Sequence, residues 1–570
     1  MKFKNIGVND YSLENAIKVV FENRNVKNPK ELLKVTKDNV IHYSKLKNIE
    51  LAVNLLLEEV KKDNHLIYVQ VDSDADGYTS SSVLIQTLKR LIPNVNIKYR
   101  LHDGKQHGII VKEVPKEVTM VIIPDAGSNQ ISEHKELKQR GINVIVLDHH
   151  ELNDEYDYNL HTDAVIVNPR LSPEHDNKDI AGVGVVYKFC KALCEKLDDD
   201  FSDEFLDLVA IGTIGDLIDL RSKESRFFVK EGLDNINNKL LKALIDEQSF
   251  SMNGIVNITS IGWYIAPLIN ACIRVGKDKE KELMFEALLN SDEEIYYKKN
   301  DEMEHISVSV ARNLGNIKAR QKRNMDKELI QIEEYIQNNK LHLEKVMILN
   351  VDGLLSNNLS GLVANKFAQK YKRPVMFLRT SGEGELSGSS RGYDKGEVKN
   401  FNEYLLQSNV MISCEGHPNA FGATIKQENI DKLKNYFNST LLEPIGHTEI
   451  DVDFIVPCQE LDIELVKKIA MFRDEWGGTL FEPKIGITDV IFGYNDLTLT
   501  GKYNNLLKTK INGISATKPY FNRDKFNELF GDGETFVCDL LVTFKLNEYQ
   551  GNLYPVVQIE EINVKETLYF

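Results

Sequence analysis

The sequence predicts an α/β protein in which a parallel, doubly wound sheet is followed by a connecting helix, a smaller α/β domain and a C-terminal β-barrel. From Leu66 onward, short apolar runs rich in β-branched residues alternate with helix-like segments. This alternation is typical of parallel strands covered by helices. Several of the apolar runs end in aspartate or histidine. Ligands bind at the carboxyl ends of strands in open α/β sheets, so this edge is the predicted functional site.

Composition limits the possible functions before any motif is considered. A chain of 570 residues exceeds what one core can support, so about three or four domains are expected. The net charge of -16 argues against a generally basic nucleic-acid coat but permits a local positive groove. The six cysteines form no C-x-x-C pair, which favours free thiols in a reducing cytosol. No signal peptide or membrane-spanning run is apparent, so we expect a cytoplasmic protein that does not contact a membrane.

Residues 1–65 are interpreted as a helical lead-in, and residues 66–290 as the first α/β domain. Its expected strands share apolar, β-branched composition and lie at Leu66–Val71, Val95–Arg100, Val118–Pro124, Asn143–Leu147 and Ala164–Val167. A further apolar run, Leu208–Asp216, also ends in an acid. We interpret it as another segment end at the same edge of the sheet.

The ends of these segments supply the candidate site. The first strand ends in D-S-D-A-D-G, and later segments end in Asp125, in Asp148-His149-His150 and in Asp216. A lone aspartate after a strand is usually a turn residue or a helix N-cap. An EF-hand loop is excluded, because no glutamate stands at its last ligand position and a strand precedes it. Four such ends on one edge repel one another unless cations hold them. Oxygen and imidazole ligands suit paired Mn²⁺ or Mg²⁺. The predicted metal ligands are Asp72, Asp74, Asp76, Asp125, His149 and Asp216.

These motifs, in this order, resemble the DHH phosphoesterase superfamily, whose name comes from Asp148-His149-His150. Within it the chain is most similar to RecJ-type single-strand exonucleases, through Ala181–Tyr187, through the segment that contains Arg100, and through Ala266–Ala271 with Arg274. The sequence departs from that pattern at Leu268 and Ile273, where RecJ-type proteins usually have Arg and Gly.

The resemblance implies catalytic roles for four residues. His150 would contact the scissile phosphate, Asp148 would orient the histidines, and His149 would bind metal. Asp76 would either bind metal or orient the loop. The resemblance also implies that Arg100, Asn270 and Arg274 bind substrate. The residues that it implies contact a terminal phosphate are Arg100, Arg274, Ser389 and Arg391.

Residues 291–340 are predicted to form the connecting helix, and Arg320 in its basic cluster is a candidate phosphate contact. Residues 341–442 form the smaller α/β domain, with two glycine-rich segments, Ser387–Gly392 and Glu415–Gly422. Small residues let phosphate approach backbone N–H groups. Both segments resemble motifs of the DHH-associated (DHHA1) domain, which implies that Ser389, Arg391 and His417 bind phosphate. Residues 443–570 contain short β-like runs and resemble the OB-fold ending of RecJ-type enzymes, a fold that binds single strands.

We therefore expect an exonuclease that hydrolyses single-stranded DNA from the 5′ end to mononucleotides with two divalent cations, Mn²⁺ or Mg²⁺. The 5′ direction rests on the resemblance. A monomer is expected, with a single-strand-binding protein or helicase as a candidate partner. Two alternatives remain open: a family phosphodiesterase acting on short oligoribonucleotides, phosphoadenosine phosphate or cyclic dinucleotides, and a non-catalytic scaffold. The choice between DNA and RNA also stays open, since it depends on side-chain geometry around the 2′-OH.

Overall fold

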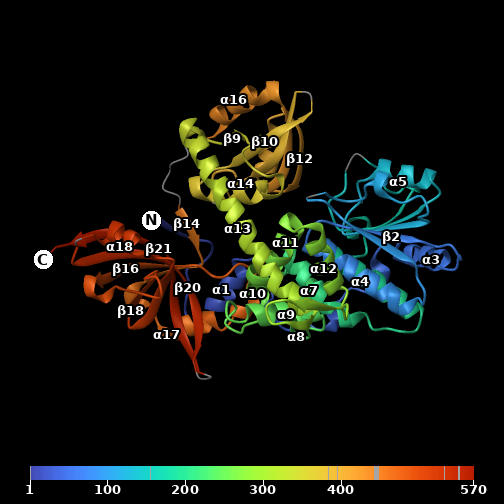
Figure 1. Ribbon diagram of the computed structural model, residues 1–570. Coiled ribbons are helices and arrows are strands. Elements are labelled where there is room, and N and C mark those ends of the chain that lie inside the picture. Colours follow the sequence, from blue (N-terminus) through green and yellow to red (C-terminus); the bar gives the residue numbers. More distant parts are fainter. Residues whose placement is uncertain are drawn as a thin grey trace. The chain divides into compact units, whose positions relative to one another are not determined.

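The computed structural model places the chain in two compact units. The structure describes the ranges 2–104, 106–153, 156–382, 384–393, 396–441, 449–531, 533–549 and 552–569. Unit 2 comprises residues 34–338 and 353–363, and unit 1 comprises residues 1–33, 339–352 and 364–570. Both units are drawn in Figure 1. The predicted boundary at residues 442 and 443 lies outside the described residues.

Unit 2 contains a five-stranded, fully parallel sheet, in which β2 is labelled in Figure 1. Its order is β3-β2-β4-β5-β6. The strands are β2 (Ile67–Val71), β3 (Ile97–Leu101), β4 (Met120–Pro124), β5 (Asn143–Leu147) and β6 (Val165–Val167). All five strands predicted from the apolar runs are confirmed, with bounds that differ by at most a few residues. Strands β2 and β4 are buried along their whole length, as expected for a parallel sheet with both faces covered.

Helices cover both faces of this sheet. On one face, Val121, Val144 and Val146 pack with Leu137 of α5 (Ile131–Gln139) in one hydrophobic cluster. On the other face, β2 and β4 contact α4 (Ala75–Leu91), and β4 and β5 contact α6 (Gly182–Lys196). The doubly wound α/β class is therefore confirmed for this unit.

One predicted segment end belongs to a helix. The run before Asp216 forms α7 (Leu206–Gly215), and Asp216 is its C-cap residue. Every residue of α7 up to Ile214 is buried, so its sequence lacks the polar stripe that distinguishes a helix from a buried strand. The interpretation of Leu208–Asp216 as part of the sheet was therefore wrong. The same turn nevertheless brings Asp216 to the predicted edge.

The remaining elements of unit 2 are helices and one hairpin. The helices are α3 (Ile49–Glu59), α8 (Lys223–Asp234), α9 (Lys239–Gln248), α10 (Ile258–Ser260), α11 (Ala266–Val275), α12 (Asp278–Leu288) and α13 (Ile306–Asn338). The hairpin is β7 (Glu294–Tyr297) with β8 (Glu302–His305). A five-residue π-helix, Ile261–Ile265, joins α10 to α11. Among the described residues, one stretch, Ile258–Val275, is apolar and long enough to cross a membrane, but 56% of it is buried inside the protein. It forms part of the core.

The smaller α/β domain in unit 1 contains a five-stranded sheet of order β12-β13-β11-β10-β9. Its strands are β9 (Met347–Asn350), β10 (Val375–Gly382), β11 (Glu385–Arg391), β12 (Met411–His417) and β13 (Ala420–Lys426). Its helices are α15 (Phe401–Gln407), α16 (Ile430–Thr440) and α14 (Ser360–Tyr371), of which α14 belongs to unit 1 from Ala364 onward. Phe401 and Leu405 of α15 and Leu433 and Phe437 of α16 pack in one cluster with alternate residues of β10, β11 and β13. The opposite face of β11, β13 and β12 is half-buried or exposed.

The C-terminal part of unit 1 is a seven-stranded sheet of order β15-β16-β20-β21-β19-β18-β17. Its strands are β15 (Phe454–Pro457), β16 (Ile485–Gly493), β17 (Thr498–Thr500), β18 (Leu506–Ile511), β19 (Ile514–Pro519), β20 (Thr535–Tyr549) and β21 (Asn552–Leu568), and the helices are α17 (Ile463–Ala470) and α18 (Arg523–Phe530). The predicted β-rich ending is confirmed. Among the described strand pairs, β15 and β17 are the edges of this sheet.

The N-terminal 33 residues belong to unit 1, whereas residues 34–65 belong to unit 2. Strand β1 (Lys2–Asn5) pairs in parallel with β14 (Glu449–Val452), and α1 (Ala16–Glu22) and α2 (Pro29–Leu33) follow it. The guanidinium of Arg24 donates to both carboxylate oxygens of Asp453, at 2.7 and 3.0 Å, and to the carbonyls of Val20 and Phe481. This buried ion pair joins two segments more than 400 residues apart in the sequence.

Candidate metal centre

The loop after β2 is held in one conformation by its own aspartates. Asp74 is the N-cap of α4, and its carboxylate accepts a hydrogen bond from the backbone N–H of Gly77 at 3.0 Å. A Cβ at Gly77 would lie 2.6 Å from Cβ of Asp72, so only glycine lets the helix start so close to the end of the strand. Asn270 of α11 accepts from the backbone N–H of Ala75 at 3.1 Å. The loop is thereby tied to α11 as well.

Asp76 is fully buried and faces the N-terminus of α6. Its two oxygens accept hydrogen bonds from the backbone N–H groups of Gly182, at 2.8 Å, and Val183, at 2.9 Å. These donors belong to the first turn of the helix, where N–H groups lack partners inside the helix. Asp76 therefore fixes α6 against the aspartate loop.

Asp125 follows β4 and lies in the left-handed region, with φ at 62°. Its Oδ1 is buried and has no hydrogen-bond partner in the described part of the chain, although Nε2 of His149 lies 3.3 Å away. A buried carboxylate oxygen without a partner is costly. A left-handed backbone conformation in a residue other than glycine, as at Asp125, is also strained, and such strain concentrates at functional sites.

Asp148 organises the two histidines that follow it. Its Oδ1 accepts from the backbone N–H groups of His149 and His150, at 2.7 and 3.1 Å, and lies 2.8 Å from Nδ1 of His150. Its Oδ2 accepts from the N–H of Ser128 at 2.9 Å. With Nδ1 bonded to Asp148, Nε2 of the half-exposed His150 ring is the atom left to contact a ligand.

The predicted ligands come together in three overlapping groups. Within each group the ligand atoms all lie within 4.8 Å of one another, and the groups are Asp125 with His149 and His150, Asp76 with His149 and Asp216, and Asp72 with Asp74 and Asp125. Nε2 of His149 links the first two, since it lies 3.5 Å from Oδ2 of Asp216 and 3.9 Å from Oδ2 of Asp76. Asp125 links the first group to the third. All six predicted metal-binding residues therefore converge, from β2, β4, β5 and α7.

The pKa directions express the repulsion within this cluster. Burial and then repulsion by neighbouring carboxylates raise the pKa of Asp76 to about 7 and that of Asp216 to about 8. The same two causes raise the pKa of Asp74, and they raise that of Asp125 well above its ordinary value. For Asp148, burial opposes ionisation, but the hydrogen bond with His150 and the nearby imidazoles hold its pKa well below the usual range.

The donor set fits divalent cations. Buried carboxylates that repel one another gain most from a positive ion placed among them. Oδ1 of Asp125, which has no hydrogen-bond partner in the described chain, could bind a cation as an oxygen ligand. Nε2 of His149, 3.3 Å from it, could bind the same cation as a nitrogen ligand. Oxygen-rich ligand sets with one imidazole suit Mn²⁺ and Mg²⁺ better than the thiolate sets of structural zinc.

Two histidines near Asp72 were missed in the sequence. Nδ1 of His107 lies 2.8 Å from Oδ2 of Asp72, while Oδ1 accepts from the backbone N–H of Gly108 at 3.0 Å. Nε2 of the buried His102 lies 3.8 Å from the same Oδ1. The signal was the position of His102 and His107 just after β3, the strand next to β2 in the sheet.

The predicted substrate contacts in unit 2 differ in their surroundings. Arg100 lies on β3 and is largely buried, with its guanidinium 3.5 Å from His102 and 3.9 Å from Asp103. Arg274 on α11 is half-buried and feels the charge of Asp74. Among the described residues its guanidinium has no hydrogen-bond or ion-pair partner. In contrast, the guanidinium of Arg320 makes two hydrogen bonds to Glu280, at 3.2 and 2.6 Å, and one to the carbonyl of Val275. Arg320 is therefore engaged in joining α13 to α12.

The other three predicted contacts share one face of the small sheet in unit 1. Arg391 and His417 are both in register with Ala420 of β13, which lies between their strands. Ser389 and Glu415 are likewise in register with Gly422. Residues in register, or two apart on one strand, point to the same face. That face is the one that α15 and α16 leave uncovered. The two glycine-rich segments therefore form one surface, with small residues at its middle.

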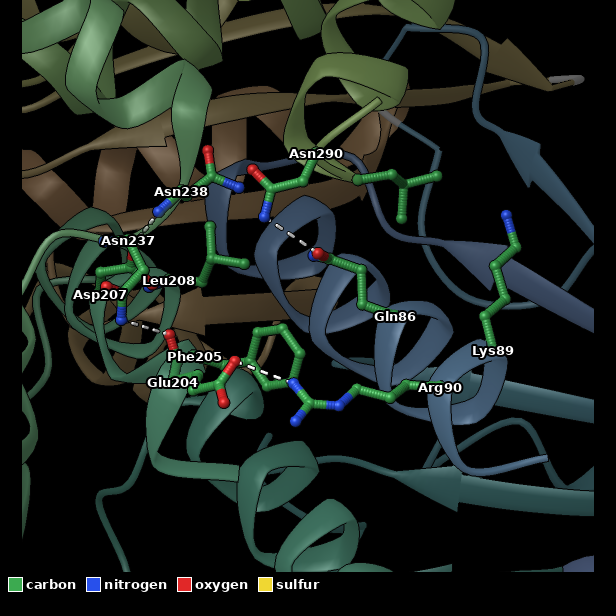
Figure 2. A pocket seen from close by; sticks show the side chains of 11 residues that line it. Gln86, Lys89, Arg90, Glu204, Phe205, Asp207, Leu208, Asn237, Asn238 and Asn290 are labelled. Atoms are coloured by element: carbon green, nitrogen blue, oxygen red, sulfur yellow. Dashed lines mark hydrogen bonds and ion pairs between the residues drawn. The ribbon is translucent and has the colours of Figure 1, made fainter. Parts of the chain in front are cut away.

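A cavity of about 410 Å³ lies elsewhere in unit 2, at the C-terminal end of α4 (Figure 2). Two pairs of its polar side chains contact each other, Arg90 with Glu204 at 2.9 Å and Asn290 with Gln86 at 3.1 Å. The aspartate cluster lies at the opposite, N-terminal end of this 17-residue helix, about 25 Å away. This cavity is therefore separate from the acidic centre.

Comparison with known proteins agrees with this geometry. Residues 65–213 match the model of the DHH family, N-terminal domain, and residues 343–443 match that of the DHHA1 domain. The chain is 40% identical over 576 residues to YorK, an SPbeta prophage-derived protein of Bacillus subtilis (strain 168) that carries the name of a single-strand DNA-specific exonuclease. That alignment covers 100% of this chain and 99% of YorK. This chain is also 26% identical over 582 residues to the single-stranded-DNA-specific exonuclease RecJ of Haemophilus influenzae. That alignment covers 94% of this chain and 93% of RecJ. The chain belongs to the RecJ-type DHH family.

The fold of this RecJ-type chain also matches a solved relative. The crystal structure of RecJ in complex with Mn²⁺ from Thermus thermophilus superposes with a TM-score of 0.70 at 20% sequence identity. The match covers 97% of this chain and 76% of that one. At the two positions where the RecJ-type chain departs from its family, Leu268 and Ile273, the side chains are buried in the core.

Proposed function

We propose that this protein is a divalent-cation-dependent exonuclease that degrades single-stranded DNA from the 5′ end to mononucleotides. The observation that carries the proposal is the convergence of five aspartates and His149 in three overlapping groups of ligand atoms, which Asp125 and His149 link. The single-stranded-DNA-specific exonucleases named RecJ, to which the chain is similar along most of its length, supply the substrate class and the reaction.

Five residues are assigned to hold two cations, Mn²⁺ or Mg²⁺: Asp72, Asp74, Asp125, His149 and Asp216. Asp125 belongs to two of the three groups of ligand atoms, so we assign it to both ions. Asp76 is assigned to orient the loop, because both its oxygens already accept hydrogen bonds from α6. The ions would lower the pKa of a bound water and stabilise the charge on the attacking and leaving oxygens of phosphodiester hydrolysis.

The protein's own side chains would position the phosphate. His150 presents Nε2 toward solvent at the rim of the cluster while Asp148 fixes its Nδ1, which suits donation of a hydrogen bond to a phosphate oxygen. Arg274 is a half-buried cation without an internal partner in the described chain and lies near Asp74, so we assign it to a phosphate. We propose that Arg100, on strand β3 next to β2, binds the terminal phosphate of the strand together with Arg274.

In unit 1, we propose that Ser389, Arg391 and His417 bind phosphates on their shared face of the small sheet. Gly422 and Ala420 between them leave room for a phosphate to approach the backbone. We further propose that the C-terminal sheet binds single-stranded DNA, that the protein acts as a monomer inside the cell, and that a single-strand-binding protein or helicase is its partner. We propose that Arg100 and Arg274 make the enzyme start at the 5′ end, because they would bind the phosphate at that end of the strand.

The test uses the purified protein with Mn²⁺ and a single-stranded oligonucleotide labelled at its 3′ end. Stepwise shortening with release of mononucleotides is expected, and a duplex should resist. Asp125→Asn should lower the rate at least about 100-fold, because it removes a ligand shared by both ions. The matched control is Asp278→Asn on the same unit, since that side chain is 85% exposed and should leave the rate unchanged. Full activity of Asp125→Asn would refute the assignment of the centre.

Two further substrates test the finer parts of the proposal. A strand blocked at its 5′ end should survive, whereas one blocked at its 3′ end should be degraded, and the reverse result would overturn the polarity. A dinucleotide should turn over more slowly than a long strand. Faster turnover of the dinucleotide would favour the family's small-substrate phosphodiesterases instead.

A further inference from the structure

The π-helix and α11 form one continuous helical segment, Ile261–Val275, with a single open side. Eight of its residues are buried, among them Ile265, Ile269 and Cys272. The exposed or half-exposed residues include Trp263, Pro267, Asn270 and Arg274. Their spacings of four, three and four residues place them along one stripe of the helix.

Trp263 is unusual on this stripe. Its side chain is 75% exposed, whereas Trp476, the other tryptophan of the chain, is 2% exposed. Its neighbour Tyr264 is 39% exposed. No ring stacks on Trp263 and no cation or hydrogen-bond partner contacts it within the described residues. The π-helix that presents it is a rare conformation that is frequently found at functional sites.

The stripe leads from Trp263 to the acidic centre. At one end, Gly262 packs on α7, since a Cβ there would lie 3.5 Å from Cγ2 of Ile214, two residues before Asp216. At the other end, Asn270 accepts a hydrogen bond from Ala75 in the aspartate loop, and the guanidinium of Arg274 is close enough to Asp74 for an electrostatic attraction. Seven residues separate Trp263 from Asn270, which is about 10 Å along a helix axis. Leu217, directly after Asp216, is also exposed and has a φ of 58°.

We propose that Trp263 is a stacking platform for a nucleobase of the single strand whose phosphate lies at the acidic centre. This subsite rests on the proposed function. The residues follow the order of the parts of a single strand. The ring of Trp263 would stack on a base, and the guanidinium of Arg274, beyond the amide of Asn270, would bind the next phosphate. Stacking on an aromatic ring accepts any base. The subsite would therefore hold the strand without reading its sequence.

The alternative occupant of an exposed tryptophan is a protein partner. The strand is favoured because the same stripe carries Arg274, a cation with no internal partner among the described residues, close to the aspartates that would hold divalent ions. An apolar protein surface would leave that guanidinium desolvated and unpaired, which is costly.

The first experiment measures binding in EDTA, so that no strand is cleaved. Titrating a single-stranded DNA oligonucleotide should quench the fluorescence of the wild type, and this quenching should disappear in Trp263→Phe, which retains only the buried Trp476. Trp263→Ala should weaken the affinity by about 5- to 100-fold, and Trp263→Phe by less than about 3-fold, because one stacked base is worth roughly 1–3 kcal/mol. The control Phe250→Ala removes a ring that is 96% exposed on the same unit and should leave the affinity unchanged.

The second experiment pairs the variant with a modified strand. A single abasic residue is moved along the oligonucleotide, and wild-type KM with Mn²⁺ should rise at one position only. In Trp263→Ala that position should have no further effect, while kcat stays within a few-fold of the wild type. A wild-type enzyme that cleaves strands while Trp263→Ala keeps its KM and affinity would overturn this inference alone. A wild type that binds strands with quenching but cleaves none would overturn the nuclease and leave the subsite supported.

Discussion

A Cβ atom at Gly182 would lie 2.7 Å from Cγ of Asp125 and would overlap Oδ1 of the same carboxylate. Gly182 is the first residue of α6, and its N–H also donates to Asp76. The start of this helix therefore touches two aspartates of the cluster through backbone atoms alone. A glycine is required there because the carboxylate of Asp125 occupies the space of a side chain.

Gly182→Ala should therefore disturb the centre although it alters no candidate ligand. The added methyl must displace Asp125, so we expect a loss of Mn²⁺ affinity of at least about 10-fold, measured by calorimetry, with a similar loss of nuclease rate. Gly315→Ala is the control, since a Cβ at this position of α13 meets no atom within 4 Å. It should stabilise the helix by up to about 1 kcal/mol. Unchanged metal affinity of Gly182→Ala would show that Asp125 is free to move.

The melting temperatures with and without Mn²⁺ should show whether the aspartates of the cluster repel one another. They would repel in a metal site, but not if they served only as structural hydrogen-bonding groups. Mn²⁺ should raise the melting temperature of the wild type, because the ions bind the folded state. Asp125→Asn should melt at the same or a slightly higher temperature than the wild type in EDTA, because it removes one repelling carboxylate. It should also lose most of the response to Mn²⁺. A large destabilisation of Asp125→Asn in EDTA would instead indicate a structural role.

The buried His134, next to the half-buried His161, should make unit 2 sensitive to acid. Nδ1 of His134 lies 3.2 Å from Nε2 of His161, and burial together with His161 lowers the pKa of His134 to about 4. A histidine with a lowered pKa contributes stability above about pH 6.5, its ordinary pKa, and that stability is lost as the pH falls toward 4. The free energy of unfolding should fall by up to about 3 kcal/mol over this window.

His134→Gln isolates this titration. The variant carries its packing cost at every pH, so its difference from the wild type should be largest at about pH 7.5 and should shrink toward about pH 4. Urea unfolding of both proteins at a series of pH values gives the two curves. Parallel curves would mean that His134 is not the group responsible.

The sheet and most of the centre were predictable because two signals agree in the sequence. Apolar, β-branched runs identify β2, β4 and β5, and the acids that end them must meet at one edge of a parallel sheet. Asp216 was placed correctly for a partly wrong reason, since a fully buried helix and a buried strand have the same apolar pattern over about ten residues. The role of Arg320 was beyond the sequence, because its partner Glu280 lies 40 residues earlier.

Other features depend on contacts that no local pattern encodes. The hydrogen bond of His107 with Asp72 arises only because β3 and β2 are neighbours in the sheet. The packing of the N-terminal residues with the C-terminal part of unit 1 joins segments from the two ends of the chain. Neither a periodicity nor a motif predicts such pairings, which topology alone determines.

The buried ion pair of Arg24 and Asp453 should hold the N-terminal segment to unit 1. Both side chains are at most 2% exposed, and Asp453 also accepts from Asn23 and from the backbone N–H of Lys484. Arg24→Met leaves a buried carboxylate without its counter-ion, which should lower the free energy of unfolding by about 3–5 kcal/mol. The exposed pair Lys18 and Glu22 is the matched control, and Lys18→Ala should cost less than about 0.5 kcal/mol.

The double variant Arg24→Met with Asp453→Leu separates the pair from its packing. Removing both charges should restore part of the stability, because the uncompensated carboxylate is gone. The guanidinium of Arg24 lies 5.4 Å from the ring of Trp476, so the fluorescence of that tryptophan in a Trp263→Phe background reports unfolding at this site. If the double variant is no more stable than Arg24→Met, the loss comes from the packing of Arg24 on Trp476 and Phe481 and not from the unpaired charge.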